Sequence, residues 1–424
     1  MLDSLQTADT ADKFSHRSTL SGRDILCFSH DWTGDPLSKT HLMRLLARNN
    51  RVLWVNSIGY RAPSLGSKRD LGRIVQKLKA VTEPVREVEK NIFAFSPLVI
   101  PSWGNPALRA LNTRLLRWQV RRVMRRLRFR RPINWVFNPA AGVLAGLLGE
   151  DRIIYYCVDE YTAFKGVDTS ALAAIEKSLI NRADLVIVSA EKLLQTKRSL
   201  RAPTLLIRHG VDYDHFASAL RPETTVPDEI ANLPRPVIGY FGLIADDWVD
   251  VPLLVHTARS FPTGSLVMLG KVTMNVSALA SEPNVHLLGR KPYESLPGYC
   301  KGFDAAVIPF PITEVTLNAN PLKAREYLAA GLPVVSTNIP EVRVLSHCRI
   351  ADSPTQFVSH LNEALSIPPT RSEISESVRT EGWESRLRQI EHHLIPILTA
   401  NETPPVVAAG RGGSPPEGAG YLSG

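Results

Sequence analysis

Short apolar segments alternate with segments of helical periodicity along most of the chain, and this alternation constrains the fold more than any other feature. Alternating β and α segments are typical of a parallel sheet covered by helices. We therefore predict an α/β fold. In the first half of the chain, seven apolar segments lie at 24–30, 51–57, 91–97, 133–139, 153–159, 185–190 and 204–210. The helical segments between them lie near 38–49, 106–128, 140–148, 169–182 and 191–199.

The alternation stops near residue 215 and starts again at Val237. The segment 216–236 is rich in proline and charge, which predicts a linker. A chain of 424 residues exceeds what one hydrophobic core usually supports. We therefore predict two doubly wound, Rossmann-like domains, 23–215 and 237–375, that face each other across a cleft. The second set of apolar segments lies at 237–244, 265–271, 285–290, 305–310, 333–337 and 349–352. Two of them, with the sequences VHLLG and AAVIPF, carry largely continuous apolar residues, as in strands buried on both faces.

The two ends of the chain differ from this pattern. Residues 1–22 are polar and residues 399–424 are dominated by Pro, Gly and small side chains, so both are predicted to be disordered. Residues 376–398 are predicted to form C-terminal helices, with a crossing back to the first domain as one option.

We predict from the composition that the protein is cytoplasmic. The four cysteines are scattered without a CxxC pair, which is typical of buried thiols in a reducing compartment, and no ligand cluster suggests a metal. The start of the chain has no apolar core of the signal-peptide kind, and no apolar run reaches the length of a membrane span.

Two basic segments account for much of the net charge of +9. Between Arg109 and Arg131 the chain has ten arginines and no acidic residue, interleaved with apolar side chains, and 68–79 repeats the pattern with lysines. Amphipathic basic helices of this kind bind anionic bilayers. Ordinary surface helices and a nucleic-acid site are the alternatives, although no nucleic-acid motif accompanies the arginines. We predict peripheral binding to the inner face of the membrane, with contacts from Lys77, Arg117, Trp118, Arg121 and Arg125.

The stretch NPLKAREYLAAGLPVVST, 320–337, places charged side chains at the start of a predicted helix. Pro321 favours the first helical position, and a helix N-terminus attracts phosphate. Lys323 adds a positive charge in the same turn, and the carboxylate of Glu326 follows one turn later, where it can accept hydrogen bonds from ribose hydroxyls. The alternative is a surface ion pair between these two residues. The stretch favours a site for a nucleoside diphosphate.

The same stretch resembles the donor-site signature of B-type, two-Rossmann glycosyltransferases, especially the large family 4 group. IGYFG, LVMLG, VHLLGR and YLAAGLPVV occur in the order found in that family. The resemblance implies that Glu326 binds the ribose, that Lys323 and the backbone near Leu322 bind the diphosphate, and that Asn320 and Gly242 belong to the donor site. It also places His209, in HGVD, near the cleft.

Two departures from the family pattern concern charge. Asn318 stands where the family has a second glutamate, with Glu314 as the nearest upstream acid, and 245–248 reads ADDW where basic residues usually follow the first strand of the second domain. The resemblance implies that no metal and no cofactor are needed; the nucleotide-sugar, linked to UDP, GDP or TDP, is the substrate.

The first-domain side of the cleft has its own candidates. Asp159 follows an apolar strand, and we expect it to act as a general base or to bind the donor sugar; capping of the next segment is the alternative. Four further residues at strand ends, with His209, are candidates for acceptor or sugar contacts: His30, Asp31, Asn138 and Glu160.

These features favour a glycosyltransferase that moves a sugar from a nucleotide-sugar to an acceptor. The two basic segments suggest a lipid-linked glycan of envelope or exopolysaccharide assembly as that acceptor. The resemblance implies retention of configuration, and the missing glutamate at Asn318 and the strand-end Asp159 leave inversion as the alternative. A nucleotide-sugar epimerase of related fold and a non-catalytic sugar-nucleotide-binding subunit are the alternatives.

Overall fold

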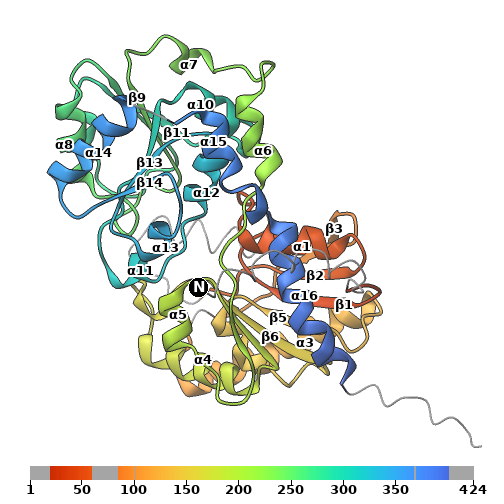
Figure 1. Cartoon of the computed structure of the whole chain (residues 1–424). Coiled ribbons are helices and arrows are strands. Elements are labelled where there is room, and N and C mark those ends of the chain that lie inside the picture. The colour runs from red at the N-terminus through yellow and green to blue at the C-terminus, as the bar shows by residue number, and fades with distance from the viewer. Residues whose placement is uncertain (1–19, 60–84, 101, 367–368, 401–424) are drawn as a thin grey trace, which may run out of the picture.

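The computed structural model describes residues 20–59, 85–100, 102–366 and 369–400, which form two α/β domains one above the other (Figure 1). Three predictions lie wholly or partly outside the described residues. They concern the predicted disorder of 1–22, of which only 20–22 are described, the basic segment 68–79 with Lys77, and the predicted tail 399–424, of which only 399 and 400 are described, Thr399 as the end of a helix.

The first domain is built on an eight-stranded sheet with the order β3-β4-β2-β1-β5-β6-β7-β8. Every neighbouring pair is parallel except β3 and β4. The strand β3 was not predicted, because its sequence REVE is charged and lies at the sheet edge. The bounds are β1 (Asp24–Phe28), β2 (Arg51–Val55), β3 (Arg86–Glu89), β4 (Ile92–Phe95), β5 (Ile133–Val136), β6 (Arg152–Cys157), β7 (Leu185–Val188) and β8 (Thr204–Leu206).

Helices and short turns follow the strands of the first domain. The longest helix begins at Pro106, where the Asn105 side chain accepts hydrogen bonds from two backbone N–H groups of the first turn. Its inner face is buried through residues such as Leu116 and Val120, as the 3.6-residue period predicts. The bounds are α1 (Ser38–Ala47), α3 (Pro106–Arg126), η1 (Pro139–Leu144), η2 (Tyr161–Ala163), α4 (Thr169–Arg182) and α5 (Glu191–Thr196).

The second domain is built on a six-stranded parallel sheet with the order β11-β10-β9-β12-β13-β14. Burial on both faces is correct for β12 but wrong for β11, which lies at the edge and is only half-buried. The strands are β9 (Val237–Phe241), β10 (Ser265–Leu269), β11 (Val285–Gly289), β12 (Ala305–Ile308), β13 (Val334–Thr337) and β14 (Cys348–Ala351). The helices are α8 (Val251–Ser260), α9 (Ser277–Ala280), η4 (Tyr293–Ser295), α10 (Leu296–Gly302), α11 (Glu314–Leu317), α12 (Leu322–Ala329), α13 (Pro340–Arg343), α14 (Pro354–Ser366) and α15 (Arg371–Glu376).

The segment 216–236, expected to be a linker, folds onto the second domain instead. It contains the end of α6 (Tyr213–Ala217), then η3 (Ser218–Leu220) and α7 (Asp228–Ala231). Phe216, Ala219 and Ile230 are buried in the second hydrophobic core. Burial of these three side chains fixes a segment whose overall composition is that of a loop.

The chain crosses between the domains twice, and the two crossings lie side by side. After η5 (Arg379–Glu381), the helix α16 (Trp383–Thr399) returns to the first domain and packs against α1, with Trp383, Ile390 and Leu394 in the first core (Figure 1). At the crossings, the Val211 N–H donates to the Glu381 carbonyl at 3.1 Å.

Candidate functional site

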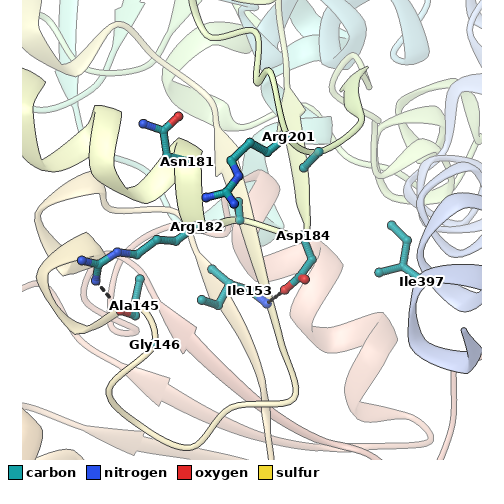
Figure 2. A pocket seen from close by; sticks show the side chains of 10 residues that line it. Ala145, Gly146, Ile153, Asn181, Arg182, Asp184, Arg201 and Ile397 are labelled. Carbon is teal, nitrogen blue, oxygen red and sulfur yellow. Dashed lines mark hydrogen bonds between the residues drawn. The ribbon is translucent and has the colours of Figure 1, made fainter. Parts of the chain in front are cut away.

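The predicted site residues lie where the carboxyl ends of the two sheets meet. Contacts across this boundary include a hydrogen bond from the Asn320 amide to the Ser189 carbonyl at 2.7 Å and an ion pair between Arg290 and Asp35. A cavity of about 580 Å³ lies elsewhere, in the first domain, where Arg182 donates to the Ala145 carbonyl and Asp184 accepts from the Ile153 N–H (Figure 2). None of the predicted site residues lines it.

Lys323 lies in the first turn of α12, which begins one residue later than predicted, after Pro321. Its ammonium is 3.0 Å from the Tyr240 hydroxyl and lies 4.4 Å from the centre of that ring and 4.9 Å from the centre of the Phe310 ring. Burial lowers the pKa of Lys323 to about 7, which the neighbouring Glu326 only partly opposes. An anion placed beside this ammonium would oppose the shift and favour the charged form.

Gly242 lies in the loop after β9, next to the Lys323 ammonium. Its φ of +136° lies in the region that favours glycine, and a Cβ there would lie 2.6 Å from the Lys323 Nζ. The loop backbone and the lysine are thus brought together from separate elements.

Glu326 lies one turn further along α12 and is partly exposed. Within the described part of the chain, the Glu326 carboxylate forms no salt bridge with Lys323. The structure therefore does not contain the alternative, a surface ion pair between these two residues. Burial raises the pKa of Glu326 to about 8; Lys323 opposes this shift and Asp212 adds to it. Its oxygens remain available to hydroxyl donors.

Asn320 is expected to bind the donor, but its side chain is already occupied by protein groups. It donates to the Ser189 carbonyl and accepts from the Arg325 guanidinium at 2.9 Å. Arg325 in turn donates to Glu381, which also pairs with Arg386. Asn320 therefore joins the start of α12 to the first domain and to the second crossing, and its donor contact stays a prediction. Leu322 likewise packs its side chain against the first core.

His209 is buried, with 6% of its surface exposed. Its Nδ1 lies 2.8 Å from the Asn320 carbonyl oxygen, which can only accept, so Nδ1 carries the proton. Its Nε2 is buried without a partner among the described residues. Burial lowers the pKa of His209 to about 3, so the ring is neutral.

Asp159 follows β6, and Glu160 rather than Asp159 caps the following η2 turn. Glu160 accepts from the Thr162 N–H and pairs with Lys197 at 2.7 Å, with 8% of its surface exposed. The carboxylate of Glu160 is engaged inside the first domain, and its sugar contact stays a prediction. Burial raises the pKa of Asp159, against the opposing charge of Lys39.

The other first-domain candidates are partly engaged in local structure. The His30 Nδ1 lies 3.1 Å from the Ser29 hydroxyl, and burial lowers the pKa of His30 to about 3. Asp31 is exposed and accepts from the Ser57 N–H, while the Asn138 side chain accepts from the Ala140 N–H and caps η1.

Two residues near the site were missed from the sequence. Arg325 was passed over as an ordinary helical arginine, although only 1% of it is exposed. Lys39, in the first turn of α1, lies close enough to Asp159 for the two charges to interact, and no local sequence signal marks it.

Apart from Lys77, which lies outside the described residues, the predicted membrane-contact residues lie on one helix, α3. Trp118 is 56% exposed and Leu111 48% exposed, and Arg117 and Arg125 are also exposed, whereas Arg121 is half-buried. The opposite face of α3 packs into the first core. No described helix has both the length and the apolar character that crossing a membrane requires.

Comparison with known proteins gives a consistent result. Residues 235–366 match the model of the family described as glycosyl transferases group 1. The TuaH protein of Bacillus subtilis (strain 168), which carries a provisional assignment as a teichuronic acid biosynthesis glycosyltransferase, is 25% identical over 282 residues, covering 60% of this chain and 70% of TuaH.

Solved structures resemble nearly the whole chain. Sucrose-phosphate synthase from Thermosynechococcus elongatus has a TM-score of 0.66 and 16% identity, covering 89% of this chain and 100% of that one. Anabaena HepE in complex with UDP has a TM-score of 0.60 and 14% identity, covering 88% of this chain and 99% of that one. At this identity the likeness concerns the fold, and it confirms the predicted two-domain architecture.

Proposed function

We propose, from the premise that this chain is a group 1 glycosyltransferase of the B-type architecture, that it transfers a sugar from a nucleotide-sugar to a glycan acceptor. The proposal depends on one observation: the Lys323 ammonium lies next to the backbone of Gly242 at the boundary of the two domains, and Glu326 lies one turn further along α12. The ammonium and the start of α12 suit a diphosphate, and Glu326 suits the ribose. HepE, of similar fold, binds UDP and UDP-glucose.

In this proposal the chain's own residues stabilise the leaving group. As the bond from the sugar to the diphosphate breaks, negative charge grows on the diphosphate, and the Lys323 ammonium, fixed against the Tyr240 and Phe310 rings, stabilises it. Retention of configuration, with the departing diphosphate accepting the proton of the acceptor hydroxyl, requires no nucleophile from the protein. Asp159 then binds the sugar; with inversion it would be the general base.

The position of Glu314 bears on the missing family glutamate. Glu314 pairs with Lys192 of the first domain at 3.0 Å and accepts from the Asn318 amide at 3.0 Å. It is therefore held at the domain boundary by these partners and does not replace the missing carboxylate at position 318. The donor site proposed here relies on Glu326 alone for the ribose.

A binding screen tests the donor site. Thermal shift and titration calorimetry with UDP-, GDP- and TDP-sugars should show one nucleotide class that stabilises the protein. Glu326→Ala should lose this stabilisation, whereas Glu363→Ala, on the distant helix α14, should keep it. Lack of binding by every nucleotide-sugar to the wild-type protein would refute the proposal.

We further propose that the acceptor is lipid-linked and that the exposed face of α3 rests on the inner membrane surface. The exposed Trp118 and the arginines around it suit the interface of an anionic bilayer. The relationship to TuaH, assigned to teichuronic acid biosynthesis, supports an acceptor of the cell-wall polysaccharide class.

Vesicle sedimentation tests the membrane contact. The protein should pellet with phosphatidylcholine vesicles that contain phosphatidylglycerol at low salt, and not with phosphatidylcholine alone. A triple variant should bind the vesicles about 100-fold more weakly or worse when Glu replaces Arg117, Arg121 and Arg125. The reason is that each cation near the surface contributes about 1 kcal/mol. The matched variant with Lys165, Arg198 and Arg201 replaced by Glu should bind as wild type; equal binding by both triple variants would overturn the assignment to α3.

A further inference from the structure

The segment ADDW, 245–248, stands where the family has basic residues, and its last residue is a tryptophan. Trp248 is half-buried in the loop between β9 and α8. Two residues later, the Asp250 N–H donates to the Pro309 carbonyl at 2.8 Å, which fixes this loop beside Phe310. The Trp248 ring lies against the Phe310 ring, with 5.2 Å between the two ring centres.

The Phe310 ring is one of two buried rings that hold the Lys323 ammonium. The Lys323 Nζ lies 4.9 Å from the centre of the Phe310 ring and 4.4 Å from the centre of the Tyr240 ring, and its hydrogen bond goes to the Tyr240 hydroxyl. Among the described residues, no carboxylate lies within 4.0 Å of this ammonium. Cation–π contacts strengthen in a desolvated site, so the two rings decide where this cation lies.

Trp248 also contacts a ring of the first domain. Phe164 follows the η2 turn, and its ring centre lies 6.4 Å from that of Trp248. Both spacings of Trp248, to Phe164 and to Phe310, fall within the range of about 4.5–7 Å at which aromatic side chains interact. A row of contacts therefore runs from the first domain through Trp248 and Phe310 to Lys323.

We propose that Trp248 is a positioning residue for Lys323: it holds the Phe310 ring against the ammonium and, through Phe164, makes the place of that ammonium depend on contact between the two domains. This inference rests on the proposed function, in which Lys323 binds the diphosphate. The segment 245–248 then compensates for the missing basic residues by fixing the one lysine, without adding a second cation. An indole suits this role because it is large, rigid and uncharged.

The test follows the proton that Lys323 takes up when UDP binds, or the diphosphate of the base that the screen selects. Burial holds the pKa of Lys323 at about 7, so binding at pH 8 is coupled to proton uptake. Trp248→Ala should let water reach the Phe310 ring and the ammonium, which raises the pKa of Lys323 towards its ordinary value. Calorimetry in buffers of different ionisation enthalpy should therefore show less proton uptake at pH 8 than in the wild type.

The affinity is compared at pH 6, where Lys323 is charged in both proteins. Trp248→Ala should bind UDP about fivefold more weakly or worse at this pH, because the ammonium is no longer held in place. Trp248→Phe keeps a ring and should restore both the affinity and the proton uptake to near the wild-type values.

Further variants separate the steps. Phe164→Ala, in the first domain, should change the affinity and the proton uptake in the same direction as Trp248→Ala, by about twofold or more in Kd. Phe93→Ala, on β4, also removes a half-buried ring and should behave as wild type. Burial raises the pKa of Glu326 to about 8, so the comparison is repeated in Glu326→Gln, where the effect of Trp248→Ala on proton uptake should persist. Unchanged melting temperatures show that the variants are folded, and Phe164→Ala carries the test if Trp248→Ala does not fold.

Several results would overturn the role of Trp248. Wild-type affinity and proton uptake in Trp248→Ala would do so while leaving the donor site at Lys323 intact. A loss of affinity with unchanged proton uptake would also do so, because Trp248 would then act on the ligand itself. Wild-type behaviour of Phe164→Ala would overturn the link to the first domain. A wild-type protein that binds no nucleoside diphosphate would refute the proposed function and the role of Trp248 with it.

Discussion

Replacement of Arg325 by Met should lower the stability of the protein more than any surface arginine replacement. Arg325 is 1% exposed and donates from Nε to Glu381 at 2.8 Å and from Nη1 to the Asn320 side chain at 2.9 Å. Methionine fills most of the volume but makes neither bond. Glu381 and Asn320 then each lose a buried partner.

The structure sets the size of the effect. Removal of one partner from a buried ion pair costs about 3–5 kcal/mol. Glu381 is 25% exposed and keeps Arg386 as a partner, so the lower end, about 3 kcal/mol, applies. For a cooperative unit of about 150–250 residues this corresponds to a fall in Tm of about 6–12 °C.

Thermal unfolding followed by circular dichroism measures this change. Arg379→Met is the matched control, because Arg379 pairs with Glu376 on the exposed surface, and its Tm should stay within the scatter of the wild type. Arg325→Lys should fall between the two, since lysine keeps the charge but not the two-pronged geometry. A fall in Tm of less than about 2 °C for Arg325→Met would refute a structural role for the contacts of Arg325 with Glu381 and Asn320.

Three further predictions concern the donor site. Glu326→Gln should weaken nucleotide-sugar binding by about tenfold or more in calorimetry, and a 2′,3′-dideoxy nucleotide should bind the wild type and the variant alike. Burial holds the pKa of Lys323 at about 7, and a bound diphosphate should raise it. Binding at pH 8 should therefore take up a proton, and the affinity should fall as the pH rises above 7. Titration in buffers of different ionisation enthalpy measures this proton uptake, which Lys323→Met should abolish. Gly242→Ala should displace the Lys323 ammonium, which a Cβ would approach to 2.6 Å, and abolish binding in the same assay, whereas Gly146→Ala, at a positive φ with open space around it, should bind as wild type.

The parts of the fold that were predicted correctly depend on local patterns. Buried strands such as β6 and β12 are apolar along their whole length, so composition alone marks them. The strand β3 was not predicted, because hydrogen bonds to β4 hold it in the sheet and its charged side chains give no sign of a strand. The segment 216–236 was assigned wrongly because a few buried side chains, among them Phe216, outweigh its loop-like composition.

The site divides in the same way. The turn from Lys323 to Glu326 was predictable because both residues lie on one helix, where spacing fixes their separation. Partners far apart in sequence were not predictable: Asn320 bonds the backbone of Ser189, and Glu160 pairs with Lys197. Lys39 carries no local signal, since its importance depends on where α1 meets the strand ends of the whole sheet.

The paired crossings at Val211 and Gly382 restrict how the two domains can move. Two chain segments bridged to each other leave rotation about the line through them as the easy motion and resist sliding and twisting. Because the chain crosses twice, a single cut near residue 211 would not yield two independent folding units. The fragment that ends there would lose α16, and the surface that Trp383, Ile390 and Leu394 cover would be open to water.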